Sequence, residues 1–250
     1  DRCYNTTKST EQFTLKRLTI EDIKLTDITT KAYDMTNINI VVNDIKAKQL
    51  VGNTKVVIKL NNKTFTDYTM QNGVLNVTLN TAKLQLKNYT LTFKFAKNSF
   101  YDYKEQNINL CIVERNIKMN IDVNNPKTTQ NLSLNVTIDD AGRTLNEGFV
   151  IFKINGKTLK DENGRTITVD VKNNTAQLNY ILTSAYNAGS VNISAHYRAK
   201  NYIQENQTVK TSIIKSDLDD VSIQIDTPKG ENTTLNITLC DEVGKQITTN

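Results

Sequence analysis

The sequence predicts an all-β protein made of tandem two-sheet sandwich modules. Three observations lead to this fold class. Apolar and polar residues alternate over short stretches, β-branched residues fill many of the alternate positions, and long phrases recur about one hundred residues apart. About seven short amphipathic strands per hundred residues are typical of a sandwich, and we find no convincing helical period.

The internal repeat is visible in paired phrases. Thr54–Phe65 (TKVVIKLNNKTF) returns as Gly148–Leu159 (GFVIFKINGKTL), and Met119–Lys127 (MNIDVNNPK) returns as Val221–Lys229 (VSIQIDTPK). A period of about one hundred residues is longer than a solenoid repeat and suits an independently folding domain. The repeat therefore predicts tandem modules.

The repeat also predicts where the modules begin and end. Corresponding closing strands are expected at 104–112 and 206–214, and a further one at 10–18. We therefore expect four parts: a terminal strand of a preceding module (1–19), a full module (20–113), a second full module (114–214), and the opening strands of a further, incomplete module (215–250). Because the sequence starts at Asp1 without an initiator Met, we expect a piece of something longer.

Strand alternation predicts which side chains face the core. Val56, Ile58 and Leu60 share one face, and the matching residues of the second module keep the same parity. The other residues predicted to face inward are Leu75, Val77, Leu79, Leu91, Phe93, Phe95, Val150, Phe152, Ile154, Val191, Ile193, Ala195 and Tyr197. Asn163-Gly164 is expected to form a type I′ hairpin turn. Pro126 and Pro228 are expected on an edge or first strand.

Composition and charge limit the function classes. Hydrophobic residues make up 38% of the chain, which is too many for disorder. The net charge is +5, but the basic residues are dispersed along strands, so a nucleic-acid partner is not predicted. No apolar run approaches the ~18 residues of a membrane span. Cys3, Cys111 and Cys240 lie far apart in the sequence, and buried free thiols are expected.

A family resemblance lies in the second module. Glu147–Gly164 (EGFVIFKINGKTLKDENG), followed by Asn187–Tyr202 (NAGSVNISAHYRAKNY), resembles the immunoglobulin-like repeats of large adhesin-like surface proteins of methane-producing archaea, which are related to bacterial Ig-like domains. The family's small residue and glycine match Ala188-Gly189, while Val191 stands where Tyr is usual. The likeness covers the second module well, the first loosely and the third at its start. It implies a fold and a surface context, and no ligand.

No catalytic, cofactor-binding or metal-binding residues are predicted, and the chain is not expected to be an enzyme. The single histidine, His196, lies between two inward-facing residues and should face solvent. No nucleophile elbow is present, and no Cys and His cluster could hold zinc.

Acidic residues offer two further candidates. Asp44, Asp140 and Asp241 recur at one position of the repeat and are interpreted as turn openers whose carboxylates accept backbone N–H bonds. The segment 215–220 (KSDLDD) lies at a module junction, and its carboxylates could alternatively bind Ca²⁺. The other junctions offer only Glu21-Asp22 and Glu114, so the pattern does not repeat.

Asn-x-Ser/Thr, the acceptor pattern for N-linked glycan, is the most numerous motif. Strand alternation alone favours it, because polar residues at i and i+2 face water together. Turn positions such as Asn62 and Asn173 should be the most accessible. The glycosylation candidates are Asn5, Asn62, Asn76, Asn88, Asn131, Asn135, Asn173, Asn192, Asn206, Asn232 and Asn236.

These features predict a non-enzymatic stalk or adhesive shaft of a large extracellular, cell-surface protein. Its partners would be other cells, surfaces, or cell-surface glycans and proteins. One alternative is a subunit of an extracellular filament assembled by strand exchange, with self-association through the incomplete terminal module. Another is the accessory region of a cell-wall enzyme.

Overall fold

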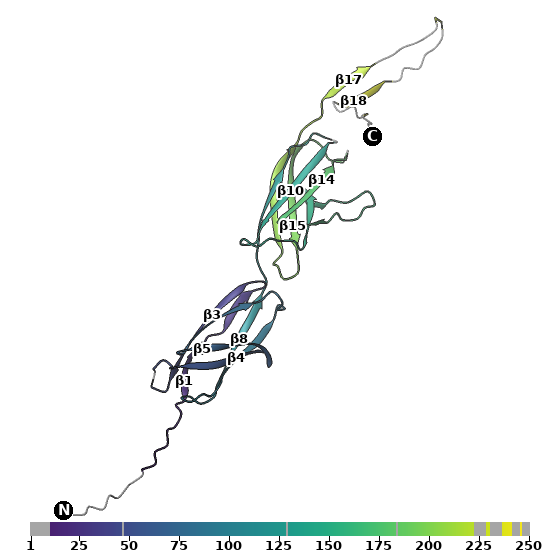
Figure 1. Cartoon of the computed structure of the whole chain (residues 1–250). Helices are drawn as coiled ribbons and strands as arrows, with labels where there is room; N and C mark the ends of the chain where they lie inside the picture. The colour runs from purple at the N-terminus through teal and green to yellow at the C-terminus, as the bar shows by residue number, and fades with distance from the viewer. Residues whose placement is uncertain are drawn as a thin grey trace, which may run out of the picture. The chain divides into compact units, whose positions relative to one another are not determined.

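The computed structural model describes residues 11–46, 48–128, 130–183, 185–222, 229–230, 237–241 and 246 (Figure 1). The described residues form strands, turns and loops and no helix, which confirms the all-β prediction. The chain divides into two compact units, residues 1–115 and 116–250.

The first unit is one continuous eight-stranded sheet in the order β1-β3-β6-β5-β4-β7-β8-β2. Its two outer strands, β1 and β2, follow each other directly along the chain, and β2 runs parallel to β8. The strands are β1 (Ile20–Lys24), β2 (Ile28–Lys31), β3 (Met35–Asp44), β4 (Asn53–Leu60), β5 (Lys63–Gln71), β6 (Val74–Asn80), β7 (Asn88–Phe95) and β8 (Lys104–Val113).

Strand β5 makes the first unit one sheet rather than the two sheets expected. It pairs with β4 along most of its length and then with β6 at Gln71 and Val74. The sheet folds over so that both layers enclose one core, which includes Ile40 from β3 and Phe93 from β7. The predicted sandwich is therefore present, with its two layers joined through β5.

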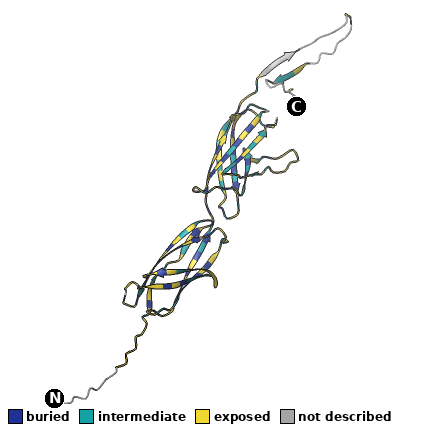
Figure 2. Ribbon diagram, in the orientation of Figure 1, coloured by how far each residue is buried: buried dark blue, intermediate teal, exposed yellow. Residues whose placement is uncertain are grey.

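Burial alternates along the strands as predicted (Figure 2). In β4, Val56 and Ile58 are buried, and Leu60 at the strand end is half-buried. All the predicted inward residues of β6 and β7 are buried as well. A strand with one buried face needs this period of two.

The second unit is a two-sheet sandwich. One sheet has the order β14-β10-β9, and the other has the order β12-β11-β15-β16 with β13 paired to β11. The strands are β9 (Lys118–Val123), β10 (Asn131–Asp139), β11 (Phe149–Ile154), β12 (Lys157–Thr158), β13 (Val169–Asp170), β14 (Thr175–Ile181), β15 (Gly189–Arg198) and β16 (Glu205–Ile213). This order of antiparallel strands is the immunoglobulin-like topology.

The core of the second unit confirms the predicted inward faces of β11 and β15, all of whose predicted residues are buried. Gly148 begins the approach to β11 with a φ of +82°. A Cβ atom there would lie 2.6 Å from Ala199 Cβ and 2.6 Å from the Arg198 carbonyl oxygen. Only glycine fits this close backbone contact.

Short turns rich in asparagine connect many of the strands. Both central residues have positive φ, as type I′ turns require, in Asn61-Asn62, Asn72-Gly73, Ala141-Gly142, Asn155-Gly156 and Asn173-Asn174. Asn and Gly tolerate this left-handed conformation better than other residues. Their abundance in the sequence therefore has a structural use at the hairpins.

The type I′ prediction for Asn163-Gly164 is wrong. Of the two residues, only Gly164 has a positive φ, +75°. The Asp161 carboxylate accepts backbone N–H bonds from Asn163 (3.0 Å) and Arg165 (2.8 Å), and Gly164 N donates to Asp161 O (2.9 Å). This capped turn with glycine in the left-handed position is the three-residue hairpin loop.

The strand expected at 10–18 is not formed over the described residues 11–17. Phe13 and Leu15 are 83% and 87% exposed, and Leu18 makes a single parallel bridge with Tyr101. A strand needs a partner, and the outer positions of the sheet are already held by β1 and β2. The assignment of 1–19 to a preceding module stays a prediction.

Beyond residue 214, β17 (Leu218–Ser222) and β18 (Thr238–Asp241) form a two-stranded antiparallel sheet. Most of the repeated phrases expected there, including Pro228, lie outside the described residues. Pro126 follows β9 and is buried, and its carbonyl oxygen accepts a bond from Ile214 N (2.9 Å).

Candidate functional site

The second strand and the last strand of the first unit meet in parallel. Strand β2 pairs with β8 over four residue pairs, from Ile28↔Leu110 to Lys31↔Val113. The carboxylate of Asp27 extends the contact, since it accepts bonds from the backbone N (2.8 Å) and the side-chain Nδ2 (3.0 Å) of Asn109. We call residues 27–31 with 109–113 the first parallel patch.

The hydrogen bonds of Asn109 lower the pKa of Asp27, the backbone bond being the larger cause. Both bonds favour the charged carboxylate over the neutral acid. The charged form of Asp27 thus belongs to the folded patch.

The second unit has a shorter contact at the same place in its topology. Thr128 N donates to Ile214 O (2.8 Å), and Ile214 N donates to Pro126 O (2.9 Å). Beyond the end of β16, Ser216 Oγ donates to Thr128 O (2.7 Å). We call residues 126–128 with 214–217 the second parallel patch. The sequence carries no signal for either patch, because they join residues more than eighty positions apart.

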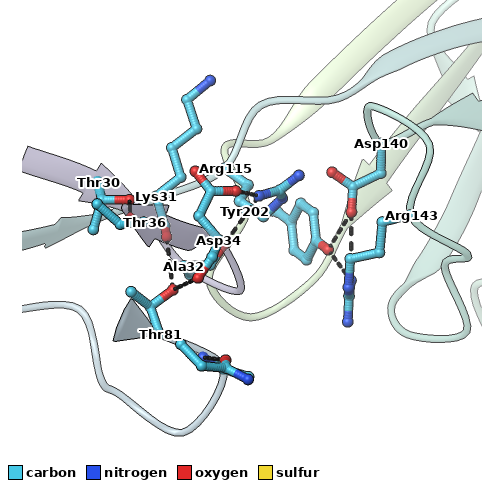
Figure 3. A network of polar contacts seen from close by, with 12 residues as sticks. Thr30, Lys31, Ala32, Asp34, Thr36, Thr81, Arg115, Asp140, Arg143 and Tyr202 are labelled. Atoms are coloured by element: carbon cyan, nitrogen blue, oxygen red, sulfur yellow. Dashed lines mark hydrogen bonds and ion pairs between the residues drawn. The ribbon is translucent and has the colours of Figure 1, made fainter. Parts of the chain in front are cut away.

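A network of polar contacts holds the turn between β2 and β3 beside the first parallel patch (Figure 3). Thr81 is fully buried, and its single hydroxyl proton is shared between Lys31 O (3.0 Å) and Asp34 O (3.1 Å). The buried guanidinium of Arg115 donates to Ala32 O (3.1 Å) and pairs with the Asp34 carboxylate. Sequence reasoning missed Arg115, whose neighbours in the sequence give no hint of burial.

Tyr202 is the centre of a polar cluster in the second unit, also drawn in Figure 3. Its hydroxyl donates to the buried carboxylate of Asp140 (2.8 Å) and accepts a bond from Arg143 Nη1 (2.5 Å). Arg143 also pairs with Glu147 at 3.0 Å. Burial, followed by the bond to Asp140, raises the pKa of Tyr202, so the hydroxyl keeps its proton.

The two units use the loop before their last strand in a similar way. A buried tyrosine stands three residues before β8 and before β16, at Tyr101 and Tyr202. The Tyr101 hydroxyl accepts a bond from Val51 N (3.1 Å), in the loop between β3 and β4. Tyr202 reaches Asp140, in the corresponding loop between β10 and β11. The repeated tyrosine spacing was the signal that could have found this tie between loops.

The predicted turn-opening aspartates differ in use. The Asp44 carboxylate accepts backbone N–H bonds from Lys46 (2.8 Å) and Lys48 (3.1 Å), which confirms the prediction. Asp140 also opens a turn, in which Arg143 N donates to Asp140 O, but its carboxylate accepts hydrogen bonds from the side chains of Tyr202 and Arg143. Asp241 ends β18, and its side chain lies outside what the structure describes.

The residues weighed for chemistry are not brought together. Over the described ranges, no group of three or more His, Cys, Asp or Glu side chains could hold a metal ion. His196 is half-buried between buried neighbours, and this burial lowers its pKa, with a bond to Asn206 opposing. In 215–220, the Asp217 carboxylate lies 3.4 Å from Lys127 Nζ, and the last three side chains lie outside the described part.

The structure places the described glycosylation candidates on turns and strands. The asparagines with exposed side chains are Asn62, Asn76, Asn88, Asn131, Asn173, Asn192 and Asn206. Asn135 differs, because it lies on the central strand β10 and its Oδ1 atom is buried without a hydrogen-bond partner. Asn5, Asn232 and Asn236 lie outside the described residues.

Cys111 and Cys240 are half-buried free thiols, and Cys3 lies outside the described residues. In the part of the chain that the structure covers, we find no helix with the length and hydrophobicity to cross a bilayer.

No family model matches the sequence, and no curated protein matches it. Similar solved structures include a tetra-tandem repeat in the extending region of a large adhesion protein, with 13% identity and a TM-score of 0.40. That match covers 90% of this chain, which spans 56% of the length of the other.

Two further solved structures are similar with comparably low sequence identity. Titin domains A168–A170 match with 12% identity and a TM-score of 0.47, over 90% of this chain and 76% of theirs. A 1.5-MDa bacterial ice-binding adhesin matches with 14% identity and a TM-score of 0.31, over 83% of this chain and 68% of its own. The fold assignment rests on the strand pairing within each unit.

Proposed function

We propose that this chain is a non-enzymatic, load-bearing stalk segment of a large cell-surface protein that binds other cells or surfaces. The parallel patches carry this proposal. In each unit, a segment near the start of the fold runs in the same direction as the end of the fold beside it, which is strand β8 in the first unit and Ile214, directly after β16, in the second. A pull on the two ends of the unit therefore slides one segment along the other.

Sliding loads all the hydrogen bonds of a patch together, whereas peeling breaks them one after another. Four residue pairs and the two Asp27 bonds share the load in the first unit. Each hydrogen bond contributes only about 1 kcal/mol at equilibrium, so resistance comes from their simultaneous rupture. Unfolding under force is governed by the unfolding rate, which this geometry lowers.

The continuity of such a stalk is supported by the strand pairing at the three repeats. The opening pairs of the first and third repeats both include the repeated aspartate, Ile20↔Asp44 in β1 and β3 and Leu218↔Asp241 in β17 and β18, while the second repeat opens one position further in, at Lys118↔Asp139 in β9 and β10. This recurrence supports reading 215–250 as the start of a further module. Residues 1–19 would then close a preceding one.

The load-bearing proposal is tested by the direction of pulling on the first unit. Chemical handles at positions 21 and 114 load the first parallel patch in the sliding direction, while handles at 33 and 114 peel it from one end. We expect a clearly higher unfolding force for the first pair. Equal forces would contradict a load-bearing patch.

The location is tested separately. An antibody raised against residues 1–250 should label intact source cells as strongly as permeabilised ones. Labelling that requires permeabilisation would contradict a surface stalk, whatever the outcome of the pulling experiment.

A further inference from the structure

Strand β14 is an outer strand without the usual protection of a sheet edge. Its seven residues, TAQLNYI, contain no charge and no proline, and its register with β10 is unbroken. Among the described strands, β10 is its only ladder partner. Open edges offer unpaired N–H and C=O groups to a second chain, and natural proteins guard them with charges, prolines, bulges or cover.

The side chains of β14 also leave apolar surface uncovered. Leu178 and Tyr180 share the inward parity of buried Ala176 but are only half-buried, and Ile181 is 62% exposed. A groove of about 620 Å³ separates the end of the strand from the loop around Asp161. In the first unit, the corresponding strand β6 has β5 on its other side.

A glycan acceptor lies immediately before this edge. Asn173 and Asn174 are the central residues of a type I′ turn, with φ of 47° and 65°. Lys172 and Thr175 close the turn through reciprocal backbone bonds of 2.9 and 3.0 Å. Thr175, the third residue of the acceptor pattern, is also the first residue of β14.

The two asparagines of the turn have different roles. Asn174 is held by the fold, since its Nδ2 donates to Ile138 O (2.9 Å) and its Oδ1 accepts from Leu145 N (3.0 Å). Asn173 is exposed, and its backbone N donates to Asn146 Oδ1 (2.7 Å). Within the described ranges, no hydrogen bond engages its side-chain amide, so the acceptor nitrogen is available to solvent.

We propose that Asn173 carries an N-linked glycan that shields the β14 edge from pairing with a second copy of this chain. The proposal rests on the cell-surface location proposed above. The donor is an oligosaccharide linked to a lipid pyrophosphate. Asn173 Nδ2 bonds to the anomeric carbon, the bond from that carbon to the pyrophosphate oxygen breaks, and the amide proton passes to a base of the transferase.

Asn135 provides a matched control, an acceptor site at which no glycan is expected. It has the same acceptor pattern, but it lies on the central strand β10 between β9 and β14, and its side chain is half-buried with the Oδ1 atom enclosed, so it is less open to a transferase than exposed Asn173. The peptide map of the protein from its source cells should show a glycan at Asn173 and none at Asn135. An unmodified Asn173, or a glycan at Asn135, would overturn the proposal.

The shielding role is tested by light scattering after size exclusion. The full chain is secreted from a host that transfers N-linked glycans. Asn173→Gly keeps the turn but removes the acceptor, and Thr175→Ser keeps the acceptor pattern. We expect Asn173→Gly to shift towards dimers or larger species, while wild type and Thr175→Ser stay monomeric. An Asn173→Gly chain as monomeric as wild type would overturn the shield.

A second substitution tests whether the chains associate through β14. Adding Gln177→Lys to Asn173→Gly places a charge on β14 and should restore the monomer. If association persists, β14 is not the contact and the proposal fails. If the antibody labels intact cells but Asn173 carries no glycan, only this inference is rejected. If the protein is absent from the cell surface, the proposed function is rejected.

Discussion

The hydroxyl of Tyr202 donates a 2.8 Å hydrogen bond to the buried carboxylate of Asp140, sixty-two residues earlier in the chain. This bond joins the loop before the last strand of the second unit to the loop between β10 and β11. Buried Asp140 is 1% exposed, so the bond replaces much of the water that the charge has lost.

Tyr202→Phe should destabilise the second unit by about 1–3 kcal/mol, because it leaves a buried acceptor without one of its donors. Hydrogen exchange at β15 and β16 amides in the full chain measures the loss. Tyr103→Phe is the matched control, since the Tyr103 hydroxyl bonds Glu105 on the exposed surface. Because the control lies in the first unit, its loss is followed at β7 and β8 amides; it should be much smaller, and equal losses would contradict the importance of burial.

Gly148→Ala should be far more harmful than Gly156→Ala. Both glycines have φ near +80°, so each alanine adds about 1–2 kcal/mol of backbone strain. Only at Gly148 does the new methyl group meet atoms within 2.6 Å, while nothing lies within 4 Å at Gly156. Urea unfolding of the two variants measures the difference. Equal midpoints would contradict the close contact.

Arg115→Gln should destabilise the first unit by about 1.5–3 kcal/mol, the range for hydrogen bonds to charged groups. The substitution removes the donor to Ala32 O and the charge that pairs with Asp34. Arg115→Lys keeps the charge but not the planar fork, so an intermediate loss is expected. Hydrogen exchange at β2 and β8 reports the effect. A wild-type exchange rate in Arg115→Gln would contradict it.

Acid should loosen the first parallel patch. Because the folded pKa of Asp27 lies below its ordinary value of 3.8, its contribution is complete above that pH and is lost as the pH falls through the folded pKa. The Asn109 amide signal, followed by NMR, should titrate with a midpoint below 3.8. Asp27→Asn should abolish that titration. A midpoint above 3.8 would contradict the stabilising bonds.

Local patterns in the sequence predicted the strands well. The alternation in Val150, Phe152 and Ile154 reflects the two faces of a strand, and a buried face cannot tolerate a shift of one residue. The turn at Asn163-Gly164 was mispredicted because the deciding group, the Asp161 carboxylate, lies outside the dipeptide that signals the turn.

Long-range relationships could not be predicted. The pairing of β2 with β8, the burial of Arg115 and the use of Asp140 by Tyr202 each join residues more than sixty positions apart. A single sequence carries no register between such segments. The candidate site therefore emerged from the fold, whereas the glycan acceptor Asn173 was visible from the sequence alone.

Single-molecule pulling on both ends of the full chain tests the load-bearing account most directly. The account predicts two separate unfolding events, with the first unit at the higher force because its patch is longer. Gly148→Ala, which weakens the second unit alone, should shift only the lower event. One shared event, or a first unit that yields at the lower force, would contradict the account.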